Sequence, residues 1–158
     1  MNKPLKIMLE GCDKTGKSTL HKLLKEEYPD IDIVDRSILS DIVFNKLFNR
    51  STYMGVPVDI YEKYWLYFHK ENTDSKVILF LTDTNVLVER SKKFNEPFCK
   101  DRTDEQLFNY IDNEQKEFVR SLAKYRQWFT GMLYVDTTKD TIEDTLKKIK
   151  VFIDESTI

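Results

Sequence analysis

The sequence is poor in glycine and in proline, which occur only four times each among its 158 residues. It has no apolar run approaching the roughly 20 residues of a membrane-spanning helix, and residues 1–4 do not resemble a secretory leader. Its two cysteines, Cys12 and Cys99, are too few for the disulfide framework of a small secreted domain. These absences predict a protein of the reducing cytoplasm that does not enter a membrane.

An excess of positive charge is also lacking. The formal net charge is −2 at pH 7, from 25 lysines and arginines against 27 aspartates and glutamates. Because no basic surplus is available to neutralise a run of phosphates, we expect no stable binding to nucleic acid. The apolar content of 41% and the length suit one globular domain spanning residues 1–158. A homodimer is left open.

Short apolar runs alternate with helical patterns along the chain. The runs that are typical of buried strands cover residues 5–9, 31–34, 77–81 and 132–135. The stretches with apolar residues at helical spacing cover residues 17–27, 38–49, 58–71, 85–93, 104–125 and 142–153. Strands that alternate with helices pair in parallel through right-handed crossovers. We therefore expect a three-layer α/β domain of the P-loop NTPase type, with about four parallel strands flanked by helices.

Two of the four glycines lie directly after the first predicted strand, as Gly11 and Gly16. The segment Gly11–Ser18 reads GCDKTGKS and matches the phosphate-loop pattern G-x-x-x-x-G-K-[ST] at every fixed position. Its backbone N–H groups and the following helix N-terminus would face bound phosphates, while Lys17 reaches the β- and γ-phosphates and Ser18 binds Mg²⁺. The residues expected to hold ATP are Gly11, Cys12, Asp13, Lys14, Thr15, Gly16, Lys17, Ser18 and Thr19.

A second polar group follows the second predicted strand, as Asp35-Arg36-Ser37. The carboxyl ends of the strands form the ligand crevice in open α/β sheets, so these side chains are expected to face the phosphate loop. Asp35 could order Mg²⁺ or accept a proton, and Arg36 could clamp a phosphate with two hydrogen bonds. The alternative interpretation is a helix N-cap with a salt-bridged arginine.

The loop sequence resembles that of thymidylate kinases, which read EGxDxxGKST where this chain has Glu10–Thr19. Asp35-Arg36-Ser37-x-x-Ser40-Asp41 is similar to the DRYxxS and ERSxxS motifs of thymidylate and deoxynucleoside kinases. Phe80–Arg90 looks like their YLD…ALER segment, and the loop at 94–104 resembles their lid. The resemblance implies that Lys14 or Arg102 stabilises charge on the transferring phosphoryl group, although Lys14 could equally be a solvated turn residue.

The acceptor region departs from this family. Only about 17 residues lie between Ser18 and Asp35, so the strand and helices that bind the acceptor nucleotide in the relatives are shortened. Tyr61 and Trp65, in the aromatic-rich segment 61–68, could stack a base instead. The alternative is that these rings pack the helix onto the sheet. His69 could act as a base, but a lone histidine is more often structural.

The sequence thus predicts an ATP- and Mg²⁺-dependent enzyme that phosphorylates a small nucleotide, with a dTMP-like deoxynucleoside monophosphate as acceptor. The residues expected to act in catalysis are Lys17, Lys14, Asp35, Arg36 and Arg102, with Ser18 and Asp35 at the metal and with Arg36, Tyr61 and Trp65 at the acceptor. One alternative is a kinase for a deoxynucleoside or a modified-base hydroxyl. Another is a regulatory ATP-binding protein, although the chain has neither the D-x-x-G nor the N-K-x-D motif of GTPase switches.

Overall fold

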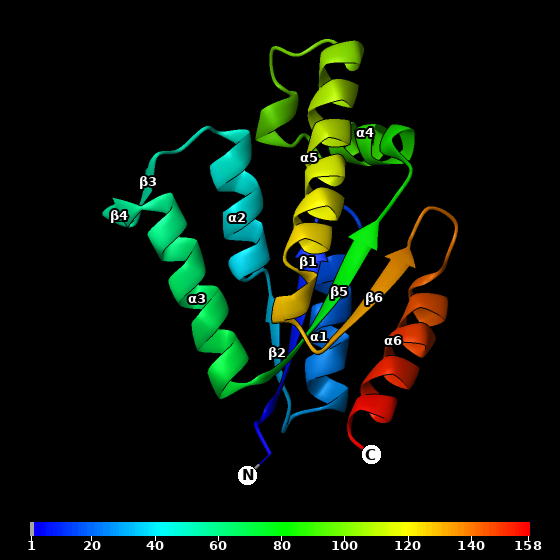
Figure 1. The fold of residues 1–158 in the computed structure, drawn as a ribbon. Coiled ribbons are helices and arrows are strands. Elements are labelled where there is room, and N and C mark those ends of the chain that lie inside the picture. The colour runs from blue at the N-terminus through cyan, green and yellow to red at the C-terminus, as the bar shows by residue number, and fades with distance from the viewer. Residues whose placement is uncertain (1) are drawn as a thin grey trace.

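A parallel four-stranded sheet forms the centre of the computed structural model, which describes residues 2–158 (Figure 1). Its strands are β1 (Leu5–Gly11), β2 (Asp32–Asp35), β5 (Asp74–Leu81) and β6 (Gly131–Asp136). They lie in the order β2-β1-β5-β6, and each neighbouring pair is parallel. The predicted number and direction of the strands are confirmed.

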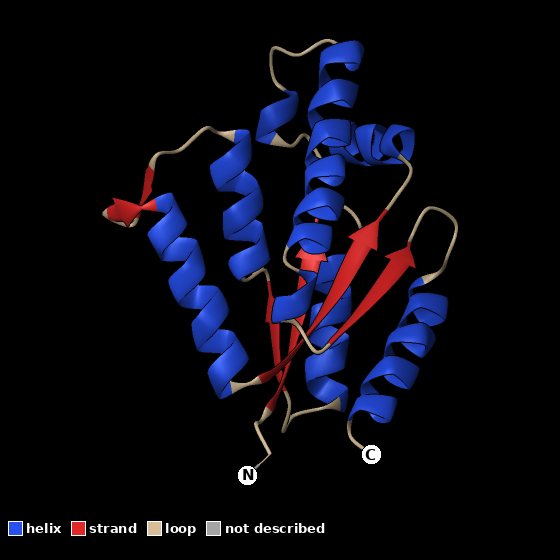
Figure 2. Cartoon of the chain, viewed as in Figure 1, coloured by secondary structure: helices blue, strands red, loops and turns tan. Residues whose placement is uncertain are grey.

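Helices cover both faces of this sheet, as Figure 2 shows. They are α1 (Lys17–Glu27), α2 (Ile38–Leu47), α3 (Val58–Asn72), α4 (Thr84–Lys93), α5 (Asp104–Lys124) and α6 (Ile142–Ser156). One hydrophobic core joins α1 and α6 to the sheet, and a second core joins α2, α3, α4 and α5 to the opposite face. The result is the predicted three-layer arrangement. No helix within residues 2–158 combines the length and apolarity required to cross a membrane.

The two central strands, β1 and β5, are apolar along most of their length because both of their faces are buried there. In β1, Met8 belongs to the core under α2 and α5, whereas its neighbours Ile7 and Leu9 belong to the core under α1 and α6. The same alternation holds in β5, where Ile78 and Phe80 face α1 and α6. All five side chains are fully buried, so the sheet is fixed in register from both sides.

Two differences from the predicted elements lie on either side of α3. Strand β5 begins at Asp74, three residues before the apolar run. Its polar first residues belong to the strand because they pair with β1 from Leu5 onward. A short hairpin, β3 (Thr52–Tyr53) and β4 (Val56–Pro57), occupies the region expected to be only a break between helices. Two-residue strands give too short a pattern to be recognised in sequence.

Candidate nucleotide-binding site

The phosphate loop lies at the carboxyl ends of the strands, between β1 and α1. The crossover from β1 leads to β2 on one side of it, and the next crossover leads from β2 past β1 to β5 on the other side. Such a switch point opens a crevice above the sheet, which is where ligands bind in this class of fold. The loop is therefore in the position that its sequence predicts.

The two loop glycines are required for different reasons. Gly11 has φ +135°, and a Cβ at this position would lie 2.5 Å from the carbonyl oxygen of Phe80 on the neighbouring strand. Gly16 has φ +88° and directly precedes the first residue of α1. Any other residue would be strained at either position. Between them, the buried Thr15 hydroxyl donates to the Cys12 carbonyl at 2.9 Å and closes the loop.

Lys17, Ser18 and Asp35 converge below this loop. The Lys17 side chain is 4% exposed, and its Nζ lies 2.8 Å from Oδ1 of Asp35. The Ser18 hydroxyl donates to Oδ2 of Asp35 at 3.2 Å. Burial alone would raise the pKa of Asp35, but the hydrogen bonds from Lys17 and Ser18 and the Lys17 charge lower it below its usual value. Asp35 is thus held as a carboxylate beside the two phosphate-loop side chains.

Arg36 also faces the loop, as predicted. Its Nη2 donates to Oδ1 of Asp13 at 2.8 Å, and its Nη1 donates to the Ser40 hydroxyl at 3.3 Å. The guanidinium lies over the Phe44 ring, 5.4 Å from its centroid. The structure therefore places Arg36 between the phosphate loop and α2, where it can meet a group that approaches the loop from the α2 side.

A cavity of about 700 Å³ opens over the phosphate loop. It is lined by Cys12–Leu20, by Arg90, Phe94 and Glu96 at the lid side, and by Thr137, Asp140, Thr141, Ile142 and Thr145 at the start of α6. This volume is in the range of small-molecule sites. Of the nine residues predicted to hold ATP, all except Gly11 line the cavity. Gly11 is the last residue of β1, where the loop begins.

Arg90 on α4 is a site residue to which sequence reasoning gave no role. Its Nη1 donates to the Lys14 carbonyl at 3.0 Å, and its Nη2 donates to the Thr137 carbonyl at 3.1 Å. It therefore ties the phosphate loop to the loop before α6 across the cavity wall. The segment that carries Arg90 matched the kinase pattern, but only the folded chain brings residues 14, 90 and 137 together.

Lys14 and Arg102, the two candidates for a mobile charge, occupy different surroundings. Lys14 has φ +68°, lies 2.5 Å from Oε1 of Glu96, and sits 4.7 Å from the centroid of the Phe94 ring. Arg102 lies over the Tyr110 ring at 4.3 Å and does not line the cavity. In this state Lys14 is at the site and Arg102 is outside it, so a role for Arg102 would require the lid to move.

A second, much smaller cavity of about 60 Å³ lies beside Arg36, between the phosphate loop, α2, the lid and α5. Its lining includes Cys12, Phe98, Tyr110 and Glu114. Glu114 is 8% exposed, and burial raises its pKa to about 7. The cavity is too small for a nucleotide, so in this state the lid residue Phe98 and α5 leave no room for one between the phosphate loop and α2.

The aromatic side chains of α3 divide into two groups. Tyr61 donates its hydroxyl to Asp41 at 2.9 Å, and Trp65 packs against the core beneath α2 and α5. Neither lines the phosphate-loop cavity or the small cavity. Three other rings of this helix, Tyr64, Tyr67 and Phe68, are between 40% and 59% exposed. The acceptor role of Tyr61 and Trp65 stays a prediction, and packing explains their present contacts.

His69 is buried near the opposite end of the sheet, one turn before α3 ends. Burial lowers its pKa to about 4, and its Nδ1 has no partner within the described residues. Like Tyr61 and Trp65, it lines neither cavity of the site. The histidine is therefore neutral at physiological pH and part of the packing.

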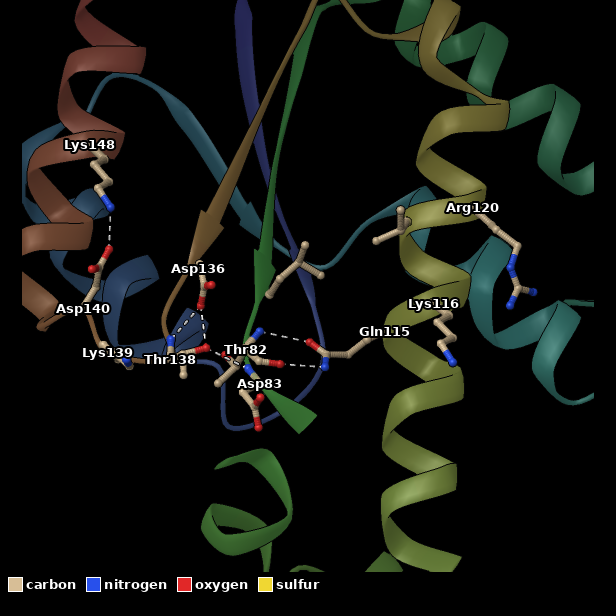
Figure 3. A pocket seen from close by; sticks show the side chains of 12 residues that line it. Thr82, Asp83, Gln115, Lys116, Arg120, Asp136, Thr138, Lys139, Asp140 and Lys148 are labelled. Atoms are coloured by element: carbon tan, nitrogen blue, oxygen red, sulfur yellow. Dashed lines mark hydrogen bonds and ion pairs between the residues drawn. The ribbon is translucent and has the colours of Figure 1, made fainter. Parts of the chain in front are cut away.

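A larger cavity of about 860 Å³ lies on the other side of the loop that follows β6 (Figure 3). Gln115 on α5 forms two hydrogen bonds with the Thr82 backbone at the floor of this cavity. Its side-chain oxygen accepts from the Thr82 N–H at 3.0 Å, and its side-chain nitrogen donates to the Thr82 carbonyl at 2.7 Å. The cationic side chains at its rim, Lys116, Arg120 and Lys148, are more than half exposed and pair with carboxylates. Because it contains no buried charge aimed inward, we place the triphosphate in the phosphate-loop cavity instead.

Oxygen atoms of Ser18 and Asp35 are suitable ligands for Mg²⁺. The ion usually takes one or two protein oxygens together with substrate phosphates and water, rather than an all-protein cage. No group of three His, Cys, Asp or Glu side chains in residues 2–158 is arranged to hold a metal. The hard-oxygen donor pair next to Lys17 fits the ion that a triphosphate brings with it.

Comparisons with known proteins agree with this geometry, although no family model matches the chain. The protein named "Putative thymidylate kinase 251L" of Invertebrate iridescent virus 6 is 43% identical over 68 residues, which are 43% of this chain and 29% of that protein. The matched segment thus spans less than a third of the relative's own length.

Two solved structures resemble the whole fold. Thymidylate kinase from Candida albicans has a TM-score of 0.59 at 16% identity, covering 99% of this chain and 93% of that one. Shikimate kinase from Bacteroides thetaiotaomicron has a TM-score of 0.54 at 14% identity, covering 95% and 98%. The chain therefore has the P-loop kinase fold and is similar in sequence, over part of its length, to a thymidylate kinase-like protein.

Proposed function

We propose that this protein transfers the γ-phosphoryl group of ATP to a deoxynucleoside monophosphate, with dTMP as the first candidate. The observation that carries the proposal is the convergence of Lys17, Ser18 and Asp35 under the phosphate loop, with Arg36 beside them. The first three residues suit the donor and its metal ion. Arg36 suits an anionic acceptor that approaches from the opposite side.

The donor half of the reaction relies on charge and positioning. Lys17 would leave Asp35 and contact the β- and γ-phosphate oxygens, where negative charge must be stabilised as the phosphoryl group moves. Mg²⁺ bound to Ser18 and ordered by Asp35 would neutralise the same oxygens. Lys14 is close enough to contribute from within the loop, whereas Arg102 would join only after a movement of the lid at 94–104.

The acceptor half depends on Arg36. A monophosphate carries about two negative charges near neutral pH, and the arginine fork matches its oxygens. The current partner of Nη2 is Asp13, whose side chain is 57% exposed and can turn away when a stronger anion arrives. Because only a small cavity separates Phe98 from the phosphate loop and α2, we propose that acceptor binding displaces the lid. Tyr61 and Trp65 remain our candidates for contacts to the base.

Two other functions make different predictions for the same site. A kinase for a nucleoside or modified-base hydroxyl would not need Arg36 as a phosphate clamp. It would depend more on carboxylates such as Asp35 and Asp41. A regulatory ATP-binding protein would bind ATP and Mg²⁺ without turnover. Both functions are compatible with the shortened acceptor region.

A panel of acceptors distinguishes these functions. The protein is incubated with ATP and Mg²⁺ and with each of the common deoxynucleosides and their monophosphates, and ADP release is measured above the blank without acceptor. We expect release with one or more monophosphates and none with nucleosides. Efficient phosphorylation of a nucleoside alone would replace the proposed function with the hydroxyl kinase. ATP binding without release in any mixture would indicate the regulatory protein.

A further inference from the structure

Glu10 is a buried carboxyl group directly before the phosphate loop, and its partners lie in the segment that follows β2. Its side chain has no solvent exposure. Oε1 accepts hydrogen bonds from the Ser37 backbone N–H and from the Ser37 hydroxyl, each at 2.7 Å, and Oε2 accepts one from the Ser40 hydroxyl. The carboxyl thus joins the end of β1 to the first turn of α2.

The Ser40 hydroxyl extends this connection to Arg36. Ser40 is 4% exposed, and its oxygen accepts the hydrogen bond from Nη1 of Arg36 at 3.3 Å. A guanidinium can only donate and a carboxylate can only accept, so the Ser40 oxygen accepts from Arg36 while its proton points to Glu10. The direction of the whole chain, from Arg36 through Ser40 to Glu10, is therefore set by the groups at its two ends.

Arg36 requires such support because its backbone is strained. Its φ is +69°, in the left-handed region that side-chain-bearing residues rarely adopt, at a cost on the order of 1 kcal/mol. The backbone N–H of Arg36 bonds to the Leu9 carbonyl at 2.9 Å, beside Glu10. A residue in this conformation persists only if neighbouring bonds hold it, and the buried carboxyl supplies three of them within the same turn.

The two sides of the Arg36 guanidinium consequently have partners of different kinds. Nη1 is bound to a buried hydroxyl that cannot move without breaking the bond to Glu10. Nη2 is bound to Asp13, which is more than half exposed. The first partner is held in place by its own bond to the buried Glu10, and the second is exposed enough to be exchanged for an incoming anion.

We propose that Glu10 is a positioning residue for the acceptor phosphate: through Ser40 it fixes Nη1 of Arg36, so that Nη2 is presented to the acceptor when Asp13 turns away. The inference rests on the proposed function for the identity of the anion. It does not require Glu10 to touch the substrate. A glutamine at position 10 could not replace the carboxylate, because the Ser37 N–H would hold its oxygen and its NH₂ would face Ser40 as a second donor, which leaves the Ser40 proton without its acceptor.

Steady-state kinetics of four variants test the inference. Glu10→Gln and Ser40→Ala should each raise the KM for the monophosphate acceptor about tenfold and leave the KM for ATP within twofold of wild type, since neither residue lines the ATP cavity. Ser121→Ala is the matched control, because Ser121 is equally buried at 4% but lies on α5 outside the network. Ser40→Thr keeps the hydroxyl and should restore the acceptor KM.

The outcomes separate positioning from a general structural role. An acceptor KM within twofold of wild type in folded Ser40→Ala would overturn the inference. So would an equal rise in both KM values, or a loss in Ser40→Thr as large as in Ser40→Ala. If Glu10→Gln does not fold, the Ser40 pair still decides.

A separate measurement covers failure of the proposed function. If the wild-type protein neither binds nor phosphorylates any monophosphate, the Arg36 side-chain nitrogens are followed by NMR in the free protein. Rotation of the guanidinium should become faster in Glu10→Gln and Ser40→Ala and remain unchanged in Ser121→Ala. Unchanged rotation in all three variants would refute the positioning role independently of the substrate.

Discussion

The ammonium group of Lys17 lies 2.8 Å from Oδ1 of Asp35, a residue 18 positions further along the chain. Lys17 is almost completely buried, and a buried charge is costly unless it is paired. Asp35 therefore occupies the place of a phosphate oxygen in the free protein. Under the proposed function, a triphosphate would take Lys17 and leave the carboxylate and the adjacent Ser18 hydroxyl to order a metal ion.

Replacing Lys17 with alanine tests the phosphate-loop mechanism. The lysine would act where water is largely excluded, and one preorganised donor of this kind contributes roughly 3 kcal/mol to transition-state stabilisation. We expect Lys17→Ala to lower kcat by a hundredfold or more in the ADP-release assay. Lys22→Ala, an exposed change on the same helix, is the control. Activity within threefold of wild type would disprove the mechanism.

Lys14 and Arg102 can be distinguished by their kinetic effects. If Lys14 acts only in the transition state, Lys14→Met should lower kcat and kcat/KM together and leave ATP affinity nearly unchanged. Arg102 lies outside the cavity on Tyr110, so a lid function predicts that Arg102→Met weakens ATP binding as well. ATP titration followed by fluorescence and steady-state kinetics measure both. A silent Lys14→Met with an inactive Arg102→Met would reverse the assignment.

Arg36→Lys separates the shape of the guanidinium from its charge. Lysine keeps the positive charge but cannot bond Ser40 and the acceptor phosphate with a single planar group. We expect the KM for dTMP to rise about tenfold, or roughly 1.4 kcal/mol, with ATP affinity little changed. Unaltered dTMP kinetics in this variant would show that Arg36 does not contact the acceptor.

Glu114 should make stability depend on pH. Burial raises its pKa from 4.5 to about 7, so between these values the folded protein holds a proton that the unfolded chain has lost. The free energy of unfolding should therefore decrease as pH rises through this window, by up to about 3 kcal/mol for this one group.

Urea unfolding at pH 5, 6, 7 and 8 measures this dependence. Glu114→Gln cannot ionise. The free energy of unfolding of this variant, taken relative to wild type, should therefore be higher at pH 8 than at pH 5. Glu105→Gln, an exposed change in the first turn of the same helix, provides the comparison. If the free energies of unfolding of wild type and Glu114→Gln differ by the same amount at every pH, the Glu114 carboxyl is not held in its neutral form.

The sequence alone determined the order of the main elements and the phosphate loop. Both follow from local information: apolar runs and helical periods indicate buried strands and helices, and the loop requires fixed residue types at fixed spacing. Asp35 and Arg36 could also be assigned to the site, because the carboxyl ends of neighbouring parallel strands meet at one edge. Residues separated by 17 or 18 positions were thus placed together without coordinates.

Only the tertiary structure decided which distant side chains complete the site. Arg90 crosses to the carbonyls of Lys14 and Thr137, and Glu114 reaches the space beside Arg36 from the far end of the chain. The sequence assigned Glu10 only to the start of the loop motif, and its three hydrogen bonds to the start of α2 are formed only in the folded chain. These contacts depend on helix packing and on the side-chain directions it imposes, which no spacing along the sequence encodes.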